Sequence, residues 1–149
     1  MKIIFYILFV VFLSINIVSA KENNYYLTLK YNKVNVRYGP GRDYPIKYVY
    51  NKKNLPVKVI DKKENFRKII DFKKNSGWIH TSQLKKDKSF ILLKDQILFS
   101  KPTKHSKPLF KISKGRLVIV KKCKKNWCRV KTENYTGWIK NEKVWGAFK

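Results

Sequence analysis

Two glycines separated by one residue, Gly39 and Gly41, lie in a short stretch whose residue types could bind a phosphate group. Residues 34–45 read VNVRYGPGRDYP, so arginines and tyrosines surround the glycines. A phosphate-binding loop also needs a helix directly after the glycines, because the N–H groups and the dipole of the helix start attract the anion. Here Asp-Tyr-Pro follows, and the next residues have the pattern of a strand. The stretch therefore predicts a turn between two strands rather than a phosphate site.

The residue types that most often perform acid–base or nucleophilic chemistry are sparse in this sequence. There are two histidines, His80 and His105, and neither has a nearby Ser or Cys together with a third group that could orient it. The sequence also lacks paired carboxylates at a shared turn, which glycoside hydrolysis would need. We therefore predict a protein that is not an enzyme and that has no cofactor and no bound metal.

The two cysteines, Cys123 and Cys128, flank the sequence KKNW. In an exported chain an even cysteine count favours a disulfide, and two paired strands could carry a cross-strand bridge. A redox-active pair would normally have two intervening residues rather than four. A zinc site would be only half ligated, because no His or further Cys lies nearby. A disulfide is the favoured interpretation, and the other two stay open as alternatives.

The chain is strongly basic, with 35 Lys and Arg against 9 Asp and Glu and a formal net charge of +26. This charge by itself attracts cell-wall polymers, anionic lipid head groups and nucleic acid, although the sequence has no specific nucleic-acid motif. Many lysines come in pairs, nearly all of which are expected in turns. These pairs are either solvated hairpin tips or a basic end of each domain that binds polyanions in a salt-dependent way. The pairs are Lys52 and Lys53, Lys62 and Lys63, Lys73 and Lys74, Lys85 and Lys86, Lys121 and Lys122, and Lys124 and Lys125.

Residues 1–20, MKIIFYILFVVFLSINIVSA, have the layout of a secretory signal peptide, with one Lys, an apolar run and small residues before a polar segment. The alternative is an uncleaved membrane anchor, but a spanning helix needs about 20 apolar residues, and Ser14 and Asn16 interrupt this run. No cysteine follows the run, so a lipid anchor is not expected. No later segment of the sequence is apolar enough to span a membrane. We predict cleavage after Ala20 and export to the periplasm or to the outside of the cell.

Beyond residue 20 the sequence is a series of short β-branched and aromatic segments separated by turn residues, which predicts an all-β fold. The series occurs twice, with a period of about 60 residues, the length of a minimal independent domain. The clearest match is SGWI at residues 76–79 against TGWI at residues 136–139. We therefore predict two domains, residues 21–86 and residues 87–149. The linker is so short that the second domain is expected to pack on the first.

Finer matches between the repeats place Pro40 opposite Pro102 and Leu55 opposite Leu117. Gly77 and Gly137, each of which precedes a repeated tryptophan, are expected to enter the last strand with a positive φ. The tryptophans that follow, Trp78 and Trp138, are expected to cover one end of each barrel as core residues, because the indole ring buries a large area.

Residues 34–84 resemble the bacterial SH3-like domain, which is usually found in exported proteins. The family pattern Leu-Asn-Val-Arg-x-Gly-Pro is matched by Asn35, Val36, Arg37, Gly39 and Pro40, and an aromatic–Pro pair and a late Gly-Trp-Ile match as well. The paired arrangement resembles the exported proteins with tandem SH3-like domains that occur in many alphaproteobacteria. This resemblance implies two tandem small SH3-like β-barrels after a signal peptide, without catalytic residues of their own.

The resemblance also implies where a ligand would bind, since ligands of SH3-like barrels commonly lie in a shallow groove beside the first long loop. The candidate groove residues are Arg37, Tyr38, Tyr44 and Trp78, although each tyrosine could instead pack within the loop. Arg37 is expected to bond loop carbonyls or to lie on an aromatic ring. The corresponding stretch of the second domain, LFSKPTKHSKP at residues 98–108, lacks the Arg and both glycines. Binding is therefore expected in the first domain, or to differ in the second.

Three functions are compatible with these features. The first is non-catalytic binding of cell-envelope material, above all peptidoglycan or its peptides, an expectation that rests on fold-level analogy. The second is interaction with an envelope protein in the same compartment. The third is charge-driven binding to anionic surfaces through the lysine pairs, which would weaken steeply with salt.

Overall fold

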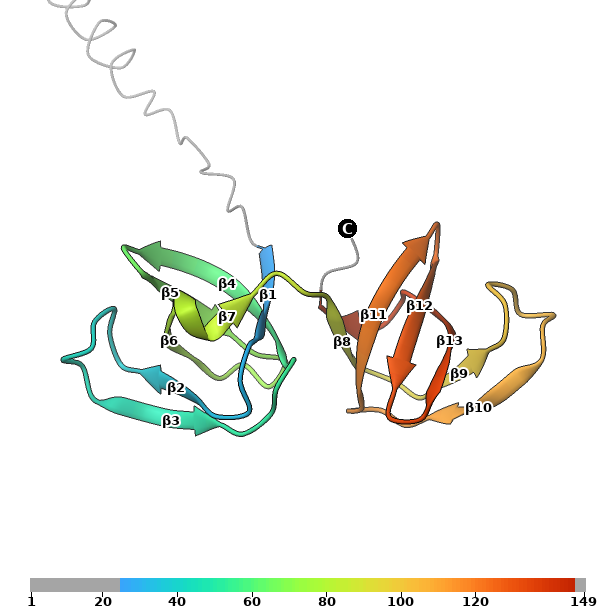
Figure 1. Cartoon of the computed structure of the whole chain (residues 1–149), viewed down its shortest axis with the longest axis horizontal. Helices are drawn as coiled ribbons and strands as arrows, with labels where there is room; N and C mark the ends of the chain where they lie inside the picture. The colour runs from blue at the N-terminus through green and yellow to red at the C-terminus, as the bar shows by residue number, and fades with distance from the viewer. Residues whose placement is uncertain (1–24, 147–149) are drawn as a thin grey trace, which may run out of the picture.

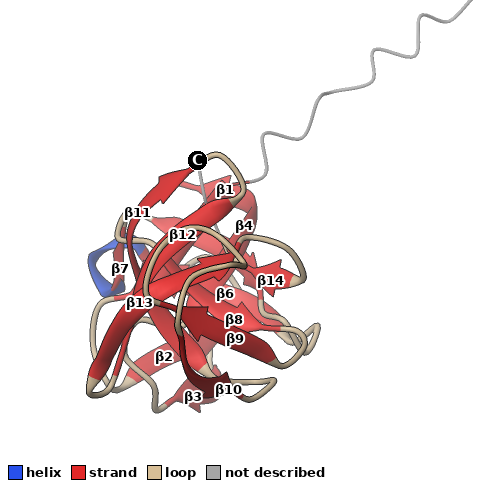
Figure 2. Cartoon of the chain, turned by 90° about the vertical axis from the view of Figure 1, so that its right-hand side faces the viewer, coloured by secondary structure: helices blue, strands red, loops and turns tan. Residues whose placement is uncertain are grey.

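The computed structural model describes residues 25–146 and folds them into two β-sheets of seven strands each. Figure 1 shows the sheets as two small barrels side by side, one from each half of the described chain. A single 3-10 turn, η1 (Thr81–Gln83), is the only helical element of the described residues (Figure 2). The all-β fold with two tandem small barrels is therefore confirmed, whereas the predicted signal peptide at residues 1–20 lies outside the described residues.

The first barrel begins with β1 and ends with β7. Its longest strand, β4, has eight residues, and the other strands are shorter. In chain order the strands are β1 (Tyr25–Leu29), β2 (Val34–Arg37), β3 (Ile46–Tyr50), β4 (Pro56–Lys63), β5 (Phe66–Ile70), β6 (Ser76–His80) and β7 (Leu84–Lys85).

The second barrel repeats this series after the three residues 86–88. Its longest strand, β11, again has eight residues. In chain order the strands are β8 (Ser89–Leu92), β9 (Gln96–Phe99), β10 (Pro108–Ile112), β11 (Leu117–Lys124), β12 (Trp127–Thr132), β13 (Tyr135–Lys140) and β14 (Val144–Trp145).

The two sheets have the same strand order. The first runs β3-β2-β6-β5-β4-β1-β7, and the second runs β10-β9-β13-β12-β11-β8-β14, so every strand corresponds to the one seven places later. The antiparallel pairing of β4 with β5 and that of β11 with β12 are each interrupted by a bulge at the same place. The structure thus confirms the predicted repeat, and even the bulge occurs at the same place in both barrels.

The pairing registers correct one detail of the predicted repeat. Leu55 gives its carbonyl to the N–H of Leu29, and Arg116 gives its carbonyl to the N–H of Leu92 in the same way. Leu55 therefore corresponds to Arg116, and the expected match with Leu117 is wrong by one residue. Leu55 is buried in the core, whereas Arg116 is exposed. A match by residue type therefore paired Leu55 with Leu117, the residue after its true counterpart.

Each barrel has a small apolar core, built from the inward-facing residues of alternating strand positions. The residues that are fully buried in the first barrel include Val34, Val36, Val57, Ile69 and Ile79. The equivalent set of the second barrel includes Phe90, Leu98, Val118, Val130 and Ile139.

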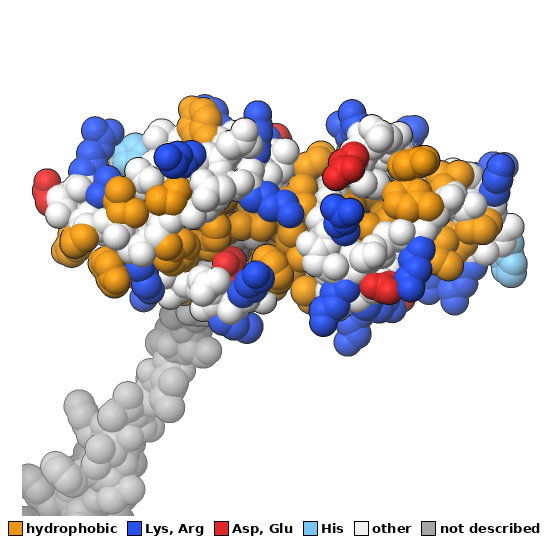
Figure 3. All heavy atoms as spheres, turned by 90° about the horizontal axis from the view of Figure 1, so that it is seen from below, with side chains coloured by type: hydrophobic (Ala, Val, Ile, Leu, Met, Phe, Trp, Pro, Cys, Tyr) orange, Lys and Arg blue, Asp and Glu red, His pale blue; other side chains and the backbone are white. Residues whose placement is uncertain are grey.

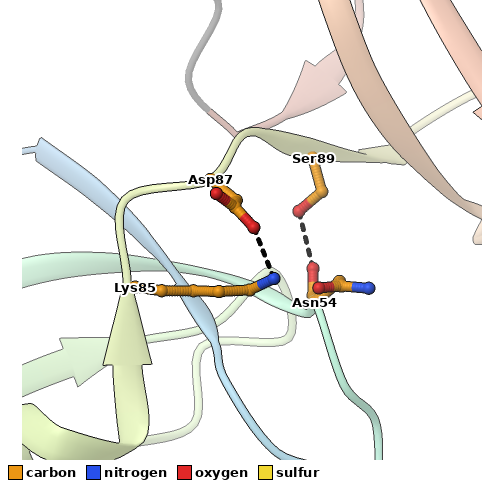
Figure 4. Close-up of polar contacts among 4 residues, drawn as sticks. All are labelled: Asn54, Lys85, Asp87 and Ser89. Atoms are coloured by element: carbon orange, nitrogen blue, oxygen red, sulfur yellow. Dashed lines mark hydrogen bonds and ion pairs between the residues drawn. The ribbon is translucent and has the colours of Figure 1, made fainter.

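The barrels pack directly on each other, as the short linker predicts. Ile91 belongs to the second barrel yet lies in the core cluster of the first, and Leu117 and Trp145 pack against the same cluster. At the edge of this junction the buried Ser89 hydroxyl donates a hydrogen bond of 2.6 Å to the carbonyl of Asn54 (Figure 4). The two barrels are therefore joined by both apolar and polar contacts.

Candidate functional site

The end of β2 and the loop between β2 and β3 hold three of the four residues predicted to form a ligand groove. Arg37 ends β2, and Tyr38 and Tyr44 lie in the loop, while Trp78 lies on β6 directly opposite Arg37 in the sheet register. In Figure 1 this loop lies at the end of the first barrel that points away from the second. The four predicted residues thus occupy one region of the surface.

Arg37 holds the loop closed. Its Nη1 donates a hydrogen bond of 2.7 Å to the carbonyl of Tyr44, and the N–H of Tyr38 donates one of 3.2 Å to the carbonyl of Pro45. Of the two roles expected for Arg37, the structure therefore has the bond to a loop carbonyl. A guanidinium suits this role because it remains charged and presents donors in a fixed fork. Arg37 therefore fixes the position of Tyr44 through this hydrogen bond to the Tyr44 backbone.

Gly39 and Gly41, the two glycines first considered as part of a phosphate site, leave space for the aromatic ring of Tyr44. A side chain placed on Gly39 would collide with the ring of Tyr44, and one on Gly41 would come within 3.2 Å of it. After the loop the chain enters β3 rather than a helix. The glycines are needed because the Tyr44 ring lies directly over the backbone, and the predicted turn is confirmed.

Three apolar side chains of this region remain open to solvent, together with one cation. Tyr38 is 63% exposed, Tyr44 47% and Ile46 46%. The ammonium of Lys47 lies 5.7 Å from the centre of the Tyr38 ring and donates to the carbonyl of Ser76. We call Tyr38, Tyr44, Ile46 and Lys47 the Tyr38 face. Figure 3 shows exposed hydrophobic side chains at this end of the first barrel.

The glycine before each repeated tryptophan does not have a positive φ, which corrects the sequence-based expectation. The glycines with positive φ in the described part of the chain are Gly115 and Gly146. A side chain on Gly77 would instead collide with Val36 and lie 3.0 Å from the carbonyl of Arg37. Gly77 is required because β2 and β6 approach each other closely where the barrel closes.

The two repeated tryptophans lie on the outer face of their sheets and are only half-buried, so the expectation that they form the core is wrong. The core residue of each motif is the following isoleucine, Ile79 or Ile139, which is fully buried. In a strand, neighbouring side chains point to opposite faces, so a buried isoleucine places the tryptophan outside. Trp78 thus remains accessible beside Arg37, while Trp138 has the ammonium of Lys122 over its ring.

The equivalent loop of the second barrel, between β9 and β10, has different chemistry. Ser106 occupies the place of Tyr44, and its hydroxyl donates to the carbonyls of Lys101 and Thr103, at 3.1 and 2.9 Å. Lys101 and Thr103 stand where the first loop has its glycines, and the small serine leaves space for their side chains. Phe99 replaces Arg37 and packs edge-on against Trp127. The second loop is therefore held by a hydroxyl rather than by a guanidinium and lacks the exposed tyrosines.

A shallow hollow of about 510 Å³ lies beside the second loop, between it and the turn before β12. It is lined by basic and polar side chains, among them Lys104, His105 and Lys140, with Trp127 as its aromatic wall. The two loops lie at opposite ends of the molecule (Figure 1). A short ligand therefore cannot contact both of them at once.

A buried polar cluster next to the first core was not predicted. Asp71 is 2% exposed, and its carboxylate accepts hydrogen bonds from Tyr50, from the N–H of Lys73 and from both the N–H and the side chain of Asn75. Burial raises the pKa of Tyr50, and Tyr48 and Asp71 raise it further. The signal in the sequence is an Asp directly after a strand and before a polar turn, the position at which Asp side chains bond the backbone ahead of them.

His80 has a structural role at the turn after β6, whereas His105 lines the hollow beside the second loop. The Nδ1 of His80 accepts from the N–H of Ser82 at 3.2 Å and lies 2.7 Å from the Ser82 hydroxyl, so the ring caps η1. His80 also packs edge-on against Phe66. Among residues 25–146, no three His, Cys, Asp or Glu side chains are grouped so that they could hold a metal ion. The same part of the chain contains no helix that is long and apolar enough to cross a membrane.

Cys123 and Cys128 form a disulfide and are direct partners in the pairing of β11 with β12. Cys128 is fully buried and belongs to the core of the second barrel, whereas Cys123 packs against it from outside. The corresponding pair in the first barrel is Lys62 and Arg67. The bridge therefore closes one hairpin of the second barrel only.

The lysine pairs are distributed over both barrels, and not all of them lie in turns. Lys121 and Lys122 lie inside β11, at its bulge, so the expectation of a turn is wrong for this pair. Both are exposed, because the outer face of this long strand extends beyond the core and is solvated. Lys62 and Lys63 end β4, next to the hairpin turn.

Two small β-barrels with the same strand order, arranged in tandem, define the class of this protein by its fold. The sequence profile of the bacterial SH3 domain matches residues 30–86 and again residues 94–146. The chain therefore belongs to the bacterial SH3 domain family, with two copies of the domain in tandem. No match is found among curated protein sequences.

Solved structures that are similar to this chain match it at low sequence identity. NlpC1 from Trichomonas vaginalis is 14% identical with a TM-score of 0.39, over 85% of this chain and 47% of that one. NlpC2 from the same organism is 13% identical with a TM-score of 0.38, over 85% and 49%. An NlpC/P60 family protein from Bacillus cereus is 13% identical with a TM-score of 0.37, over 83% and 56%. The chain thus spans about half the length of these structures.

Proposed function

We propose that this chain is an exported, non-catalytic binding protein whose first barrel recognises peptidoglycan or its peptides. Within this proposal residues 1–20 are removed on export, and residues 21–86 and 87–149 form the two domains. Bacterial SH3 domains are binding domains and are commonly periplasmic or extracellular, which supports both the class of function and the location. The observation that carries the proposal is the Tyr38 face, an exposed aromatic surface on a loop that is held from within.

The Tyr38 face has the composition of a peptide-binding or sugar-binding surface. Tyrosine offers a large apolar ring and a polar hydroxyl at a low entropic cost of ordering, so exposed tyrosines are efficient contact residues. Lys47 supplies a positive charge next to Tyr38, suited to the carboxylates of peptidoglycan stem peptides. Arg37 and the two loop glycines hold Tyr44 in place before a ligand arrives, which lowers the entropy lost on binding.

The proposal assigns different roles to the four predicted groove residues. Tyr38 and Tyr44 contact the ligand, and Trp78 provides part of the floor next to them. Arg37 acts as a positioning residue, because its guanidinium is already bonded to the Tyr44 carbonyl. The second barrel keeps a counterpart of Trp78 in Trp138 but lacks the arginine and both tyrosines, so it contributes no equivalent site.

Cosedimentation with purified peptidoglycan tests this proposal. The chain is expected to bind in a saturable manner and to remain bound at high salt, because a shaped apolar contact does not depend on counterion release. Tyr38→Ala is expected to weaken binding by about tenfold or more, as for a central aromatic contact. Tyr31→Ala is the matched control, since Tyr31 is 49% exposed but lies outside the Tyr38 face.

The proposal is wrong if wall binding is absent, or if Tyr38→Ala and Tyr31→Ala bind like the unaltered chain. Wall binding that disappears at moderate salt would instead point to the lysines alone.

A protein partner in the same compartment is the second candidate. The Tyr38 face combines aromatic and aliphatic exposure, and such surfaces also mark protein–protein contacts. In that case crosslinking in the cell envelope would recover one protein in stoichiometric amount, and Tyr38→Ala would abolish its recovery.

A further inference from the structure

A basic trough runs between the two barrels, and we propose that it binds a linear acidic polysaccharide. The trough consists of three neighbouring hollows of about 600, 310 and 340 Å³. All three are lined by Lys121 on β11, and the first two also share Asn54 and Ile119. The hollows are therefore parts of one continuous surface along the outer side of β11.

The length of the trough suits a chain rather than a single small molecule. Its lining on β11 extends from Leu117 to Cys123, which corresponds to roughly 20 Å in a strand. Leu117 and Ile119 form the apolar part of the floor, and Lys52 approaches from the turn after β3 of the first barrel. An extended polymer could lie along the whole of this floor.

Positive charge dominates the lining of the trough. Five basic residues and one acidic residue line the first hollow: Lys52, Lys111, Arg116, Lys121, Lys131 and Glu133. Toward the other end Lys85, Lys86, Lys88 and Lys122 accompany the single acid Asp87. A concave surface lined by one sign of charge concentrates the potential and attracts oppositely charged ligands. Figure 3 shows Lys and Arg side chains on both sides of the junction between the barrels.

The contacts between the barrels give the trough a defined width. The turn that carries Lys52 and Asn54 is bonded to the second barrel, because Ser89 donates to the carbonyl of Asn54. In Figure 4 the side-chain amide of Asn54 points away from this contact. Trp145 Nε1 donates a hydrogen bond of 3.1 Å to the carbonyl of Pro56 close by. Both walls of the trough therefore belong to one packed unit.

A buried hydroxyl in the second hollow indicates that the ligand carries neutral polar groups as well as charge. Thr28 is 2% exposed, yet its Oγ1 has no hydrogen-bond partner, although buried hydroxyls normally have one. The hollow lined by Thr28 also contains the cations Lys85, Lys88 and Lys121. A sugar that bears both hydroxyl and carboxylate groups suits this hollow, because its carboxylates would pair with the lysines and a hydroxyl would reach Thr28 Oγ1 after a small shift of the wall that covers this atom.

The aromatic content of the trough favours a glycan over a nucleic acid. Single-stranded nucleic acid is usually bound by a series of aromatic rings on which successive bases stack. The lining of the trough includes one aromatic pair, Phe110 and Tyr135, with ring centres 4.5 Å apart, at one end. A flat membrane surface could not enter a trough between two barrels. We therefore assign the trough to a linear sugar polymer with carboxylate groups.

This inference is separate from the proposed function, because no residue of the trough belongs to the Tyr38 face. The two sites also respond differently to salt. Binding in the trough releases counterions and weakens as salt rises, whereas binding to the Tyr38 face persists. Failure of one proposal therefore leaves the other intact.

The test is calorimetric titration of the chain with a polygalacturonate hexamer over a series of salt concentrations. Lys121→Glu combined with Lys131→Glu is expected to weaken binding by about tenfold or more at moderate salt. Lys63→Glu combined with Lys101→Glu is the matched control, since it changes the net charge equally at exposed sites outside the trough. Thr28→Val should weaken binding about threefold, because it removes the unpartnered hydroxyl at nearly constant volume. Tyr38→Ala should have no effect.

Thermal unfolding of each variant establishes that the fold is kept. A selective loss in the trough variant, with the control close to the unaltered chain, supports the proposal. Equal losses in both charge variants would overturn it, because general attraction would then explain the binding. The proposal also fails if the hexamer does not bind at low salt. Tighter, trough-dependent binding of a thymidine oligonucleotide would overturn the assignment to a sugar polymer.

Discussion

The indole N–H of Trp145 is hydrogen-bonded to the carbonyl oxygen of Pro56, at 3.1 Å and across 89 positions of the sequence. Trp145 lies on β14, the last strand of the second barrel, and Pro56 begins β4 of the first. The same indole ring meets the ring of Tyr26 edge-on, with centres 5.5 Å apart. The end of the described chain thus returns to the first barrel and fastens the second barrel to it.

Replacing this indole should uncouple the barrels. Trp145→Ala removes a half-buried ring and a hydrogen bond, and we expect it to lower the free energy of unfolding by about 2 kcal/mol. Calorimetry should resolve the single unfolding transition of the unaltered chain into two. Trp127→Ala is the control, because Trp127 packs edge-on against Phe99 within the second barrel, so its loss should weaken that barrel alone. A single transition with an unchanged midpoint in Trp145→Ala would contradict this account of the junction.

The contact between Gly39 and Tyr44 predicts that a second substitution restores the stability lost through the first. Gly39→Ala places a methyl group against the Tyr44 ring and should lower the free energy of unfolding by about 1–3 kcal/mol. Adding Tyr44→Ser should recover most of this loss, since a serine occupies the same place in the second barrel, opposite Lys101 and Thr103. Chemical denaturation of the single and double variants measures the coupling. Strictly additive effects would show that the ring and the glycine do not depend on each other.

The disulfide predicts a modest and local effect of reduction. The loop between Cys123 and Cys128 is short, so reduction should lower the free energy of unfolding by about 2 kcal/mol on the chain-entropy estimate. Cys128→Ala should cost more than Cys123→Ala, because only Cys128 is fully buried in the core. Unfolding curves with and without a reducing agent provide the measurement. The account of Cys128 as a core residue would be wrong if both substitutions had equal effects.

Buried Tyr50 predicts a loss of stability at alkaline pH. Burial is the main cause that raises the pKa of Tyr50 above its ordinary value of 10.0, and neighbouring Tyr48 and Asp71 contribute. Below about pH 10 the hydroxyl is protonated in both states, so its stabilising contribution is fully present. Above that pH the unfolded chain releases the proton while the folded chain retains it, so stability falls by about 1.4 kcal/mol per pH unit.

Tyr50→Phe isolates this effect. The variant is expected to lose stability less steeply above pH 10 than the unaltered chain, although it is less stable at neutral pH because Asp71 loses a hydrogen bond. Unfolding free energies between pH 8 and about pH 11 provide the comparison. Parallel pH profiles for the two proteins would exclude Tyr50 as the source of the alkaline loss.

Most of the fold was predictable because its determinants are local. Short β-branched segments and their turns predict the strands, and the repeated Gly-Trp-Ile predicts two copies of one domain. The loop after β2 was also predictable as a turn, since the missing helix excluded a phosphate site. The tandem barrels and their contact through a minimal linker followed from these patterns.

Other features were predicted wrongly or not at all, and most of these depend on contacts between distant residues. A glycine is needed at position 77 of β6 because a side chain there would collide with Val36 on β2, and not because of a positive φ. The sequence does not show which strand lies next to Gly77. The tryptophans were assigned to the core because of their size, whereas the strand alternation that buries Ile79 and Ile139 places them outside. The trough between the barrels arises only from the way in which the two domains pack.

The central claim is that the loop after β2 is the ligand site of the first barrel. The most direct test is a titration of the isotope-labelled chain with soluble peptidoglycan fragments, followed by NMR. We predict that the amide signals of residues 37–47 shift on binding, with those of the equivalent loop at residues 100–107 unchanged. Shifts confined to the second loop or to the trough, or no shifts at saturating ligand, would contradict the claim.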